Sequence, residues 1–176
     1  MIFAETPVEG AWMVAPERAE DHRGFFARTW CAEEFAAHGL VDHWAQCSVS
    51  FNTRRGTLRG LHYQRAPQAE VKLVRCTAGA LYDVVVDLRP SSSTYLKHVA
   101  VELSASNRLM VYVPEGCAHG FQTLQDGSEV FYQISAPYSK EHAAGVRWDD
   151  PAFGISWPYP DPIMSDRDRD YPDFQR

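Results

Sequence analysis

The hydrophobic pattern along the chain is mostly the two-residue alternation that is typical of half-buried β-strands. Only residues 32–38 have helical spacing, and Gly39 follows them at the position that commonly ends a helix. The strand-like segments are residues 11–15, 25–30, 45–51, 57–63, 71–77, 81–88, 98–103, 108–113, 122–124 and 128–135. Short strands at this regular spacing predict an antiparallel β-sandwich or barrel.

Turn residues divide these strands. Ala78-Gly79 and Asp126-Gly127 each separate two strand-like segments, and we expect a β-hairpin at both places. From Trp148 onward the chain is rich in proline, which predicts an irregular arm with one helical turn. We find no repeat, linker or low-complexity tract, so we expect residues 1–176 to form a single domain.

Composition and net charge disfavour several classes of function and location. The 17 Lys and Arg residues against 23 Asp and Glu give a net charge of −6, which disfavours general binding to nucleic acids or membranes. The cysteines at positions 31, 47, 76 and 117 fit no zinc or disulfide spacing and suit a reducing compartment. The N-terminus lacks a secretory signal, and no apolar run approaches the ~20 residues of a membrane span. We expect a cytoplasmic protein.

Several titratable side chains share a strand face with apolar residues two positions away. These are Lys72, Asp83, His119 and Tyr132. Ionisable groups inside a sandwich cost several kcal/mol unless they are paired, so a group of them predicts a functional site. The alternative, that each side chain faces water, stays open at this point.

Two segments resemble cupin motifs. The PEGCAH string that begins at Pro114 has the form of the second motif. The GLHYQ string that begins at Gly60 corresponds to the first motif, but Gln replaces its second His and Glu70 comes late. His62, Glu70 and His119 could form a two-His, one-carboxylate set for iron or manganese. A cupin that has lost its metal explains the missing His better.

Longer strings give a closer resemblance. In chain order they are RGFF from Arg23, GTLRGLHYQ from Gly56, KLV from Lys72, DVVVD from Asp83, VPEGCAHGF from Val113 and WP from Trp157. Together, and over nearly the whole chain, they resemble the dTDP-4-dehydrorhamnose 3,5-epimerase family, metal-free cupins that epimerise nucleotide-linked 4-keto sugars. The resemblance implies an all-β, cupin-type jelly roll with a few short peripheral helices. It also implies no cofactor, and a homodimer in which N-terminal strands join the partner's sheet.

The resemblance also implies a reaction: inversion at C3, C5 or both, next to the C4 ketone of a nucleotide-linked 4-keto-6-deoxyhexose. A C–H beside a ketone is acidic only through its enolate, so the enzyme needs a base, a charge that stabilises the oxyanion, and an acid on the opposite face. By resemblance, His62 is the base, Lys72 the cation and Tyr132 the acid. Asp168 would orient His62, with Asp166 as the competing choice.

Further residues are assigned to substrate binding by the same resemblance. Arg23 and Arg59 would bind the diphosphate, because a planar guanidinium suits phosphate oxygens. The other substrate-binding residues would be Arg28, Gln46, Ser48, Asp83, His119, Tyr138 and Arg167.

Two positions depart from the family pattern. Arg28 stands where the family has a Glu that accepts a hydrogen bond from thymine, and arginine has only donors. The resemblance implies dTDP-4-dehydro-6-deoxy-D-glucose as the default substrate and dTDP-4-dehydro-L-rhamnose as the product. Arg28 raises the alternative hypothesis of an altered nucleotide preference, toward CDP- or GDP-linked sugars. Ser48 replaces an Asn, which shortens a phosphate or sugar contact. Both changes concern the identity of the substrate and leave the acid–base set intact.

Alternatives to the epimerase remain at this stage. They are a metal-dependent cupin oxygenase, a sugar 3,4-ketoisomerase and a non-catalytic nucleotide-sugar-binding cupin. The joint presence of a base, a cation and an acid argues against the last of these. The sequence leaves open whether the pathway makes a cell-surface polysaccharide or a deoxysugar-decorated metabolite.

Overall fold

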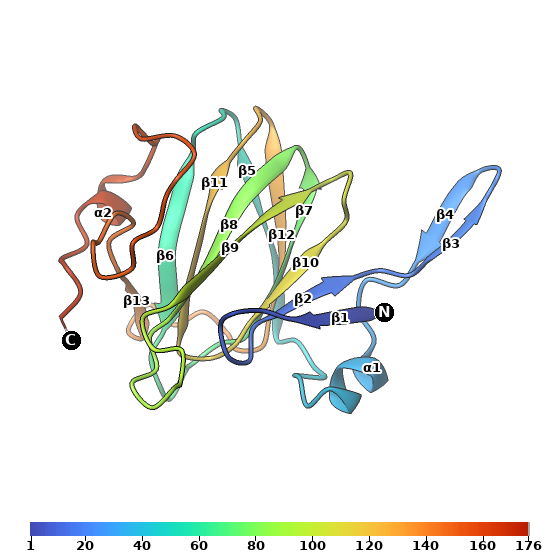
Figure 1. Cartoon of the computed structure of the whole chain (residues 1–176), viewed down its shortest axis with the longest axis horizontal. Helices are drawn as coiled ribbons and strands as arrows, with labels where there is room; N and C mark the ends of the chain where they lie inside the picture. Colours follow the sequence, from blue (N-terminus) through green and yellow to red (C-terminus); the bar gives the residue numbers. More distant parts are fainter. Residues whose placement is uncertain (176) are drawn as a thin grey trace.

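The computed structural model describes residues 1–175 and consists mainly of two antiparallel sheets that face each other (Figure 1). One sheet has the spatial order β1 (Ile2–Glu5), β2 (Trp12–Ala15), β10 (Met110–Val113), β7 (Lys72–Ala78), β12 (Ser128–Ile134) and β5 (Gln46–Asn52). The other has the order β13 (Ala143–Gly145), β6 (Leu58–Gln64), β11 (Cys117–Thr123), β8 (Ala80–Asp87) and β9 (His98–Ser104). The predicted all-β jelly roll is confirmed.

Both predicted hairpins are wrong. β7 and β8 flank Gly79, but β7 pairs with β10 and β12, whereas β8 pairs with β11 and β9 in the other sheet. β11 and β12, on either side of Gly127, are separated in the same way. Both glycines have positive φ, 73° and 66°, so the tight turns exist. They carry the chain across to the facing sheet, because that arrangement buries the apolar faces of both strands against each other.

The strand bounds differ from the prediction at a few places. β1, β3 (Arg18–Asp21) and β13 were not predicted, and β3 has no signal because all its residues are exposed. The strand expected over 25–30 is shorter: it is β4 (Gly24–Ala27), which pairs only with β3. The segment 122–124 is only the end of β11. β10 begins after Arg108 because that residue has a φ of 61°, which a strand cannot contain.

The predicted alternation of faces is confirmed in the core between the sheets. Val74 and Cys76 of β7, Leu81 and Val85 of β8, and Val130 of β12 pack in one apolar cluster. Each large side chain of this kind contributes about 1.5–3 kcal/mol by its burial. The titratable residues predicted to share these faces therefore point into the same interlayer space.

The single predicted helix is α1 (Ala32–Ala37), which buries Phe35 against the other face of the six-stranded sheet. It ends in a Schellman motif: the Leu40 N–H donates to the carbonyl of Phe35, and Gly39, with a φ of 69°, is the C′ residue. Neither α1 nor α2 (Asp166–Arg169) is long and apolar enough to cross a membrane, and these are the helices that residues 1–175 contain.

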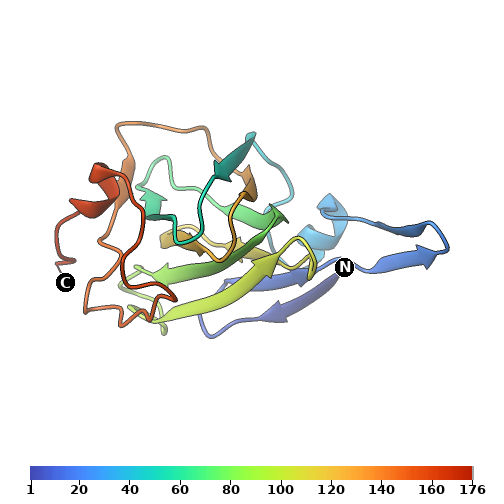
Figure 2. The ribbon, with the colours of Figure 1, turned by 90° about the horizontal axis from the view of Figure 1, so that it is seen from above.

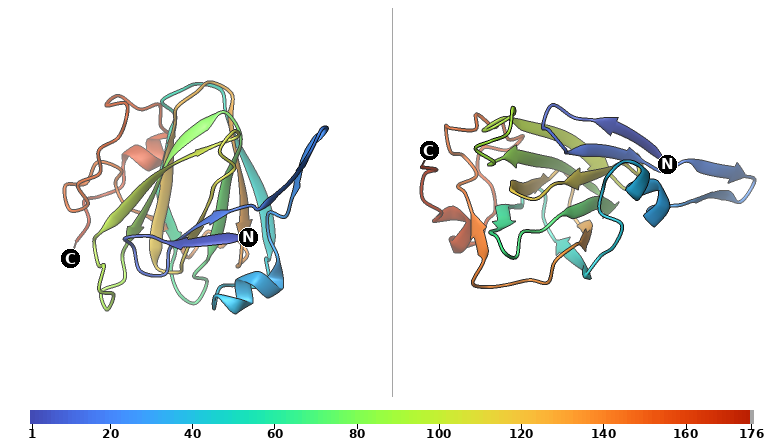
Figure 3. Two further views of the ribbon diagram at one scale, coloured as in Figure 1. Left: turned by 45° about the vertical axis from the view of Figure 1, so that its right-hand side comes forward. Right: turned by 90° about the horizontal axis from the view of Figure 1, so that it is seen from below.

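The two ends of the chain lie on opposite sides of the sandwich. The C-terminal arm and α2 lie beside β6, where α2 contacts the strand (Figure 2). The β3–β4 hairpin projects away from the body at the far side, as both views in Figure 3 show. Because of this separation, predicted site residues on the hairpin cannot meet those beside β6 within one chain.

Candidate active site

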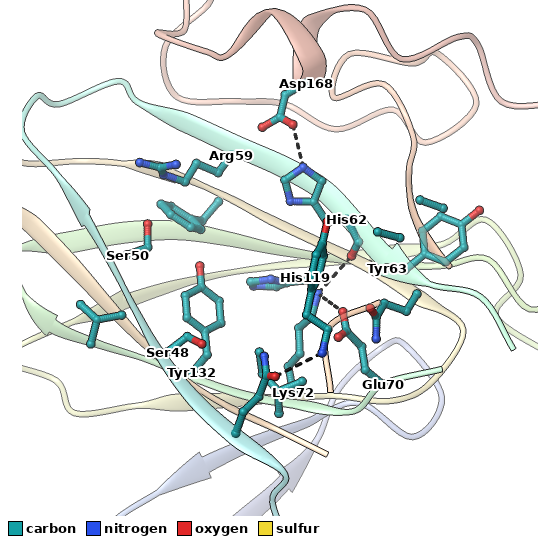
Figure 4. Close-up of a pocket in the computed structure, with 18 of the residues that line it drawn as sticks. Ser48, Ser50, Arg59, His62, Tyr63, Glu70, Lys72, His119, Tyr132 and Asp168 are labelled. Atoms are coloured by element: carbon teal, nitrogen blue, oxygen red, sulfur yellow. Dashed lines mark hydrogen bonds and ion pairs between the residues drawn. The ribbon is translucent and has the colours of Figure 1, made fainter. Parts of the chain in front are cut away.

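A cavity of about 480 Å³ opens between the two sheets and gathers most of the predicted site residues (Figure 4). The predicted residues that line it are Gln46, Ser48, Arg59, His62, Lys72, His119, Tyr132, Tyr138, Arg167 and Asp168. They come from both sheets, from the loop after β12 and from α2. Segments far apart in the sequence thus build one polar pocket.

His62 is held by Asp168. Its Nε2 lies 2.7 Å from Oδ1 of Asp168, and the Gly60 N–H donates to Oδ2 at 3.2 Å. Burial alone would raise the pKa of Asp168, but the hydrogen bond and charge of His62, with the Gly60 N–H, lower that pKa below its usual value. The ionised carboxylate favours a proton on Nε2 and leaves Nδ1 free to accept one. Asp166 is exposed, so the competing choice is wrong.

Local sequence features place this pair. A β-carbon on Gly60 would lie 2.6 Å from the α-carbon of Gly120, so the absence of a side chain lets β6 and β11 approach closely there. His62 is the register partner of His119 across these strands. Ser165 caps α2, because its hydroxyl accepts a hydrogen bond from the Asp168 N–H at 3.2 Å. The cap fixes the turn that presents Asp168 to His62.

Lys72 lies at the beginning of β7 and is only 7% exposed. Its ammonium lies 3.0 Å from Oε1 of Glu70 and donates to the carbonyl oxygen of His62 at 3.3 Å. The ion pair and the hydrogen bond offset the cost of burying the charge. Lys72 is therefore a fixed cation on the same side of the pocket as His62 (Figure 4).

Tyr132 lies on β12, across the pocket from His62 (Figure 4). Burial raises the pKa of its hydroxyl, and the negative charge of Asp83 adds to the effect. The phenol therefore keeps its proton at neutral pH and can act as a donor. Its ring packs edge-to-face on His119, with centroids 6.1 Å apart.

Asp83 requires a correction. It is fully buried behind His119, and both its carboxylate oxygens lie 3.0 Å from Nε2 of that histidine. It does not line the cavity, so it cannot contact substrate as predicted. Its strand parity is right, but the imidazole of His119 lies between it and the pocket. Asp83 instead fixes the ring orientation of His119.

The rim of the pocket is more exposed and carries cations. Nε of Arg59 donates to Oδ1 of the buried Asn52 at 2.8 Å. Tyr138 is 59% exposed, and its backbone N–H donates to Oε1 of Gln46 at 3.2 Å. Arg167 of α2 adds a second guanidinium. Such a mouth suits phosphate oxygens.

Arg23 and Arg28 do not line the pocket of their own chain. Arg23 pairs with Asp21 at 2.7 Å near the tip of the projecting hairpin, and its side chain is 78% exposed. Arg28 pairs with Glu34 of α1 at 2.9 Å. Both residues belong to the segment that leaves the sandwich. The direction of this segment makes them remote from His62, and their positions in the sequence do not reveal that direction.

Some lining residues were missed. Ser50 shares a strand face with Ser48 and Gln46, so the two-residue period could have identified it. Tyr63 also lines the cavity, and no signal in the sequence distinguishes it. The sequence indicates Glu70 only as a metal ligand, although its position two residues before Lys72 allows the ion pair that the structure has.

A metal-dependent cupin oxygenase, the alternative to an epimerase, would need a set of metal-ligating side chains. Within residues 1–175 no three His, Cys, Asp or Glu side chains are placed to hold one metal ion. His62 and His119 each direct Nε2 to a separate carboxylate, and Glu70 faces the ammonium of Lys72. These three pairings leave no carboxylate or imidazole of the set free for a metal ion.

Comparisons with known proteins agree with this geometry. Residues 5–176 match the family model described as dTDP-4-dehydrorhamnose 3,5-epimerase. A protein of that name from Sinorhizobium fredii is 42% identical over 98% of this chain and 89% of its own length. A crystal structure of that name, from Bacillus anthracis with TDP and PPi bound, is 39% identical in sequence and superposes with a TM-score of 0.95. The match covers 98% of this chain and 99% of the chain in that structure.

A narrower relative also matches. The structure of ChmJ, a 3'-monoepimerase from Streptomyces bikiniensis in complex with dTDP-quinovose, is 36% identical, with a TM-score of 0.87, over 94% of this chain and 84% of its own. Sequence, fold and site therefore converge, and the chain belongs to the dTDP-4-dehydrorhamnose 3,5-epimerase family.

Proposed function

We propose that this enzyme converts dTDP-4-dehydro-6-deoxy-D-glucose to dTDP-4-dehydro-L-rhamnose by inverting the carbons next to the C4 ketone. The relatives bearing the family name support the substrate class. The observation that carries the mechanism is the convergence of His62, Lys72 and Tyr132 on one cavity, with His62 bonded to Asp168.

The chemistry follows from the protonation states. His62 takes the proton from the carbon beside the ketone, the C–H electron pair forms the enolate, and the ammonium of Lys72 stabilises the oxyanion. Tyr132 then delivers a proton to the opposite face and regains one from solvent, while the imidazolium of His62 releases the abstracted proton to solvent. Its raised pKa keeps that proton available. Asp168 holds His62 in the basic tautomer and stabilises the imidazolium that forms.

Incubation with substrate in D₂O tests the proposal. We expect deuterium at C3, C5 or both, and its loss in His62→Ala. Label at C3 alone would indicate a single inversion, as the name 3'-monoepimerase describes for ChmJ. Transfer of the ketone to C3 would indicate a ketoisomerase, and absence of both label and product would indicate a binding protein.

We propose that the enzyme is a cytoplasmic homodimer in which the β3–β4 hairpin lies along the partner's β5. β5 is an edge strand beside the pocket, and Val49 and Phe51 on it are 57% and 58% exposed. Phe26 on the hairpin is 81% exposed. Exposed apolar groups and an open edge favour such pairing. This arrangement would place Arg23 at the partner's pocket.

A mixing experiment tests this arrangement. Arg23→Ala and His62→Ala would each be inactive as homodimers, because each lacks one element of the pocket. A mixed dimer would contain one pocket with both native residues, so activity would return after the two proteins are unfolded and refolded together. If the mixture stays inactive while sedimentation shows mixed dimers, the hairpin does not complete the partner's site.

We also propose that Arg28, brought to the partner's pocket by the same arrangement, weakens the preference for thymine there. A guanidinium only donates hydrogen bonds, so it can face a base carbonyl but cannot accept from thymine N3–H. Turnover of dTDP-, CDP- and GDP-linked 4-keto sugars should be compared for the native enzyme and for Arg28→Glu, which should shift the preference toward dTDP. A strong dTDP preference of the native enzyme would contradict the proposal.

A further inference from the structure

The C-terminal arm brings a second group to the base besides Asp168. The ring of Tyr171 packs edge-to-face on the imidazole of His62, with centroids 6.1 Å apart and planes inclined by 69°. The ring lies against Gly145, the residue that pairs with His62 on the neighbouring strand β13. Tyr171 therefore covers the side of His62 that a side chain at position 145 would otherwise cover.

The fit at this point is tight. A β-carbon on Gly145 would lie 2.3 Å from Cζ and 2.4 Å from Cε2 of Tyr171, well inside contact distance. Gly145 has no positive φ, so its backbone would accept any residue. The ring of Tyr171, and not the strand geometry, requires glycine at this position.

The aromatic ring, and not the hydroxyl, makes the useful contact. The Tyr171 hydroxyl is buried and makes no hydrogen bond of good geometry within residues 1–175, although the nearby Arg167 partly offsets the rise in its pKa that burial causes. A buried hydroxyl without a partner costs free energy. Arg167 lies 6.0 Å from the ring centre and flanks it on the pocket side. Phenylalanine at position 171 would keep the packing and remove the unsatisfied group.

We propose that Tyr171 is a positioning residue for the base. A single hydrogen bond to Asp168 fixes one nitrogen of His62 but leaves the imidazole free to tilt about that bond. The edge-to-face contact removes this freedom and holds the ring in the plane that directs Nδ1 at the substrate. The inference rests on the role proposed above for His62, and it assigns a role to a residue outside the cavity lining.

Paired variants test the contact. Tyr171→Ala should lower kcat for epimerisation about tenfold, because small misplacements of a catalytic group cost up to about 10²-fold. The loss in kcat should exceed the change in KM and in the Kd for dTDP, since Tyr171 does not line the pocket and contacts the substrate-binding rim only through Arg167. Tyr171→Phe should retain the native kcat. Gly145→Ala should displace the ring and lower kcat as Tyr171→Ala does.

The double variant and a control separate positioning from stability. In Tyr171→Ala the space beside Gly145 is empty, so adding Gly145→Ala should cost nothing more. Phe174→Ala removes another aromatic anchor of the arm, which packs on Phe153 at 5.4 Å and does not touch His62. It should lower Tm and leave kcat unchanged.

Clear outcomes would overturn the inference. These are native kcat in Tyr171→Ala, an equal loss in Phe174→Ala, or an additive loss in the double variant. An inactive native enzyme would instead refute the proposed function and leave this contact untouched, so the two failures are distinguishable.

Discussion

Replacing Asp168 by Asn is the sharpest test of the acid–base assignment. The substitution keeps the size of the side chain and removes the charge that accepts from Nε2 of His62 at 2.7 Å. A hydrogen bond to a charged group contributes about 1.5–3 kcal/mol. If the imidazolium formed during proton abstraction loses this stabilisation, kcat should fall about 10- to 150-fold, at about 1.4 kcal/mol for each factor of ten.

The assay is deuterium incorporation into the 4-keto sugar, followed by NMR, with Asp166→Asn as the matched control. Asp166 lies in the same turn and is exposed, so its variant should remain within about twofold of the native rate. Equal rates for Asp168→Asn and the native enzyme, with an unchanged Tm, would refute the assignment.

Stability against pH gives an independent measurement on the same variant. The folded-state pKa of Asp168 lies below its ordinary value of 3.8, so its ionised form stabilises the fold above that pH. This stabilisation is lost as pH falls through the folded-state pKa. The Tm difference between the native protein and Asp168→Asn should therefore be largest at neutral pH and shrink in acid. A difference that grows in acid would contradict the hydrogen bond.

Three other predictions follow from buried groups. Tyr132→Phe should lower product formation by about 10²–10⁴-fold, because the variant lacks the general acid. Some exchange of the substrate C–H with solvent should continue through His62. Product formation at the native rate would exclude Tyr132 as the general acid. Burial opposes ionisation of Asp87, but its hydrogen bonds lower its pKa to about 2. Asp87→Asn should therefore lower the free energy of unfolding, measured in urea, by about 2 kcal/mol at pH 7 and by less near pH 2. Burial raises the pKa of Cys76 to about 11 and of Cys117 to about 12, so a thiol reagent at pH 8 should reach those two only on unfolding.

The sequence predicted the parts of the structure that depend on local periodicity. Faces of strands follow a two-residue period, so the inward positions of Lys72 and Tyr132 could be read directly. Pairing could not be read in this way, because the turns at Gly79 and Gly127 have the same residue types whether the next strand stays in its sheet or crosses to the other. Strand order therefore came only from the structure.

The functional residues also fall into two groups: those that the sequence predicts and those that only the structure shows. His62 and Lys72 lie in strings that resemble a known family, so residue type and place were both predictable. The contact between Tyr171 and His62 had no sequence signal, since it joins segments about 110 positions apart and depends on a glycine, Gly145, that belongs to no motif. The remoteness of Arg23 was equally hidden, because it depends on the direction in which the hairpin leaves the sandwich.

The distribution of charge in the pocket implies an orientation for the substrate. Inside the pocket, the buried Lys72 is paired with Glu70, and the partly exposed His62 is paired with Asp168. Arg59 and Arg167 at the rim form no ion pair with any carboxylate of residues 1–175. In a chain of net charge −6, these two guanidinium groups are where a diphosphate gains most. The diphosphate should therefore lie at the mouth, which directs the keto sugar inward between His62 and Tyr132.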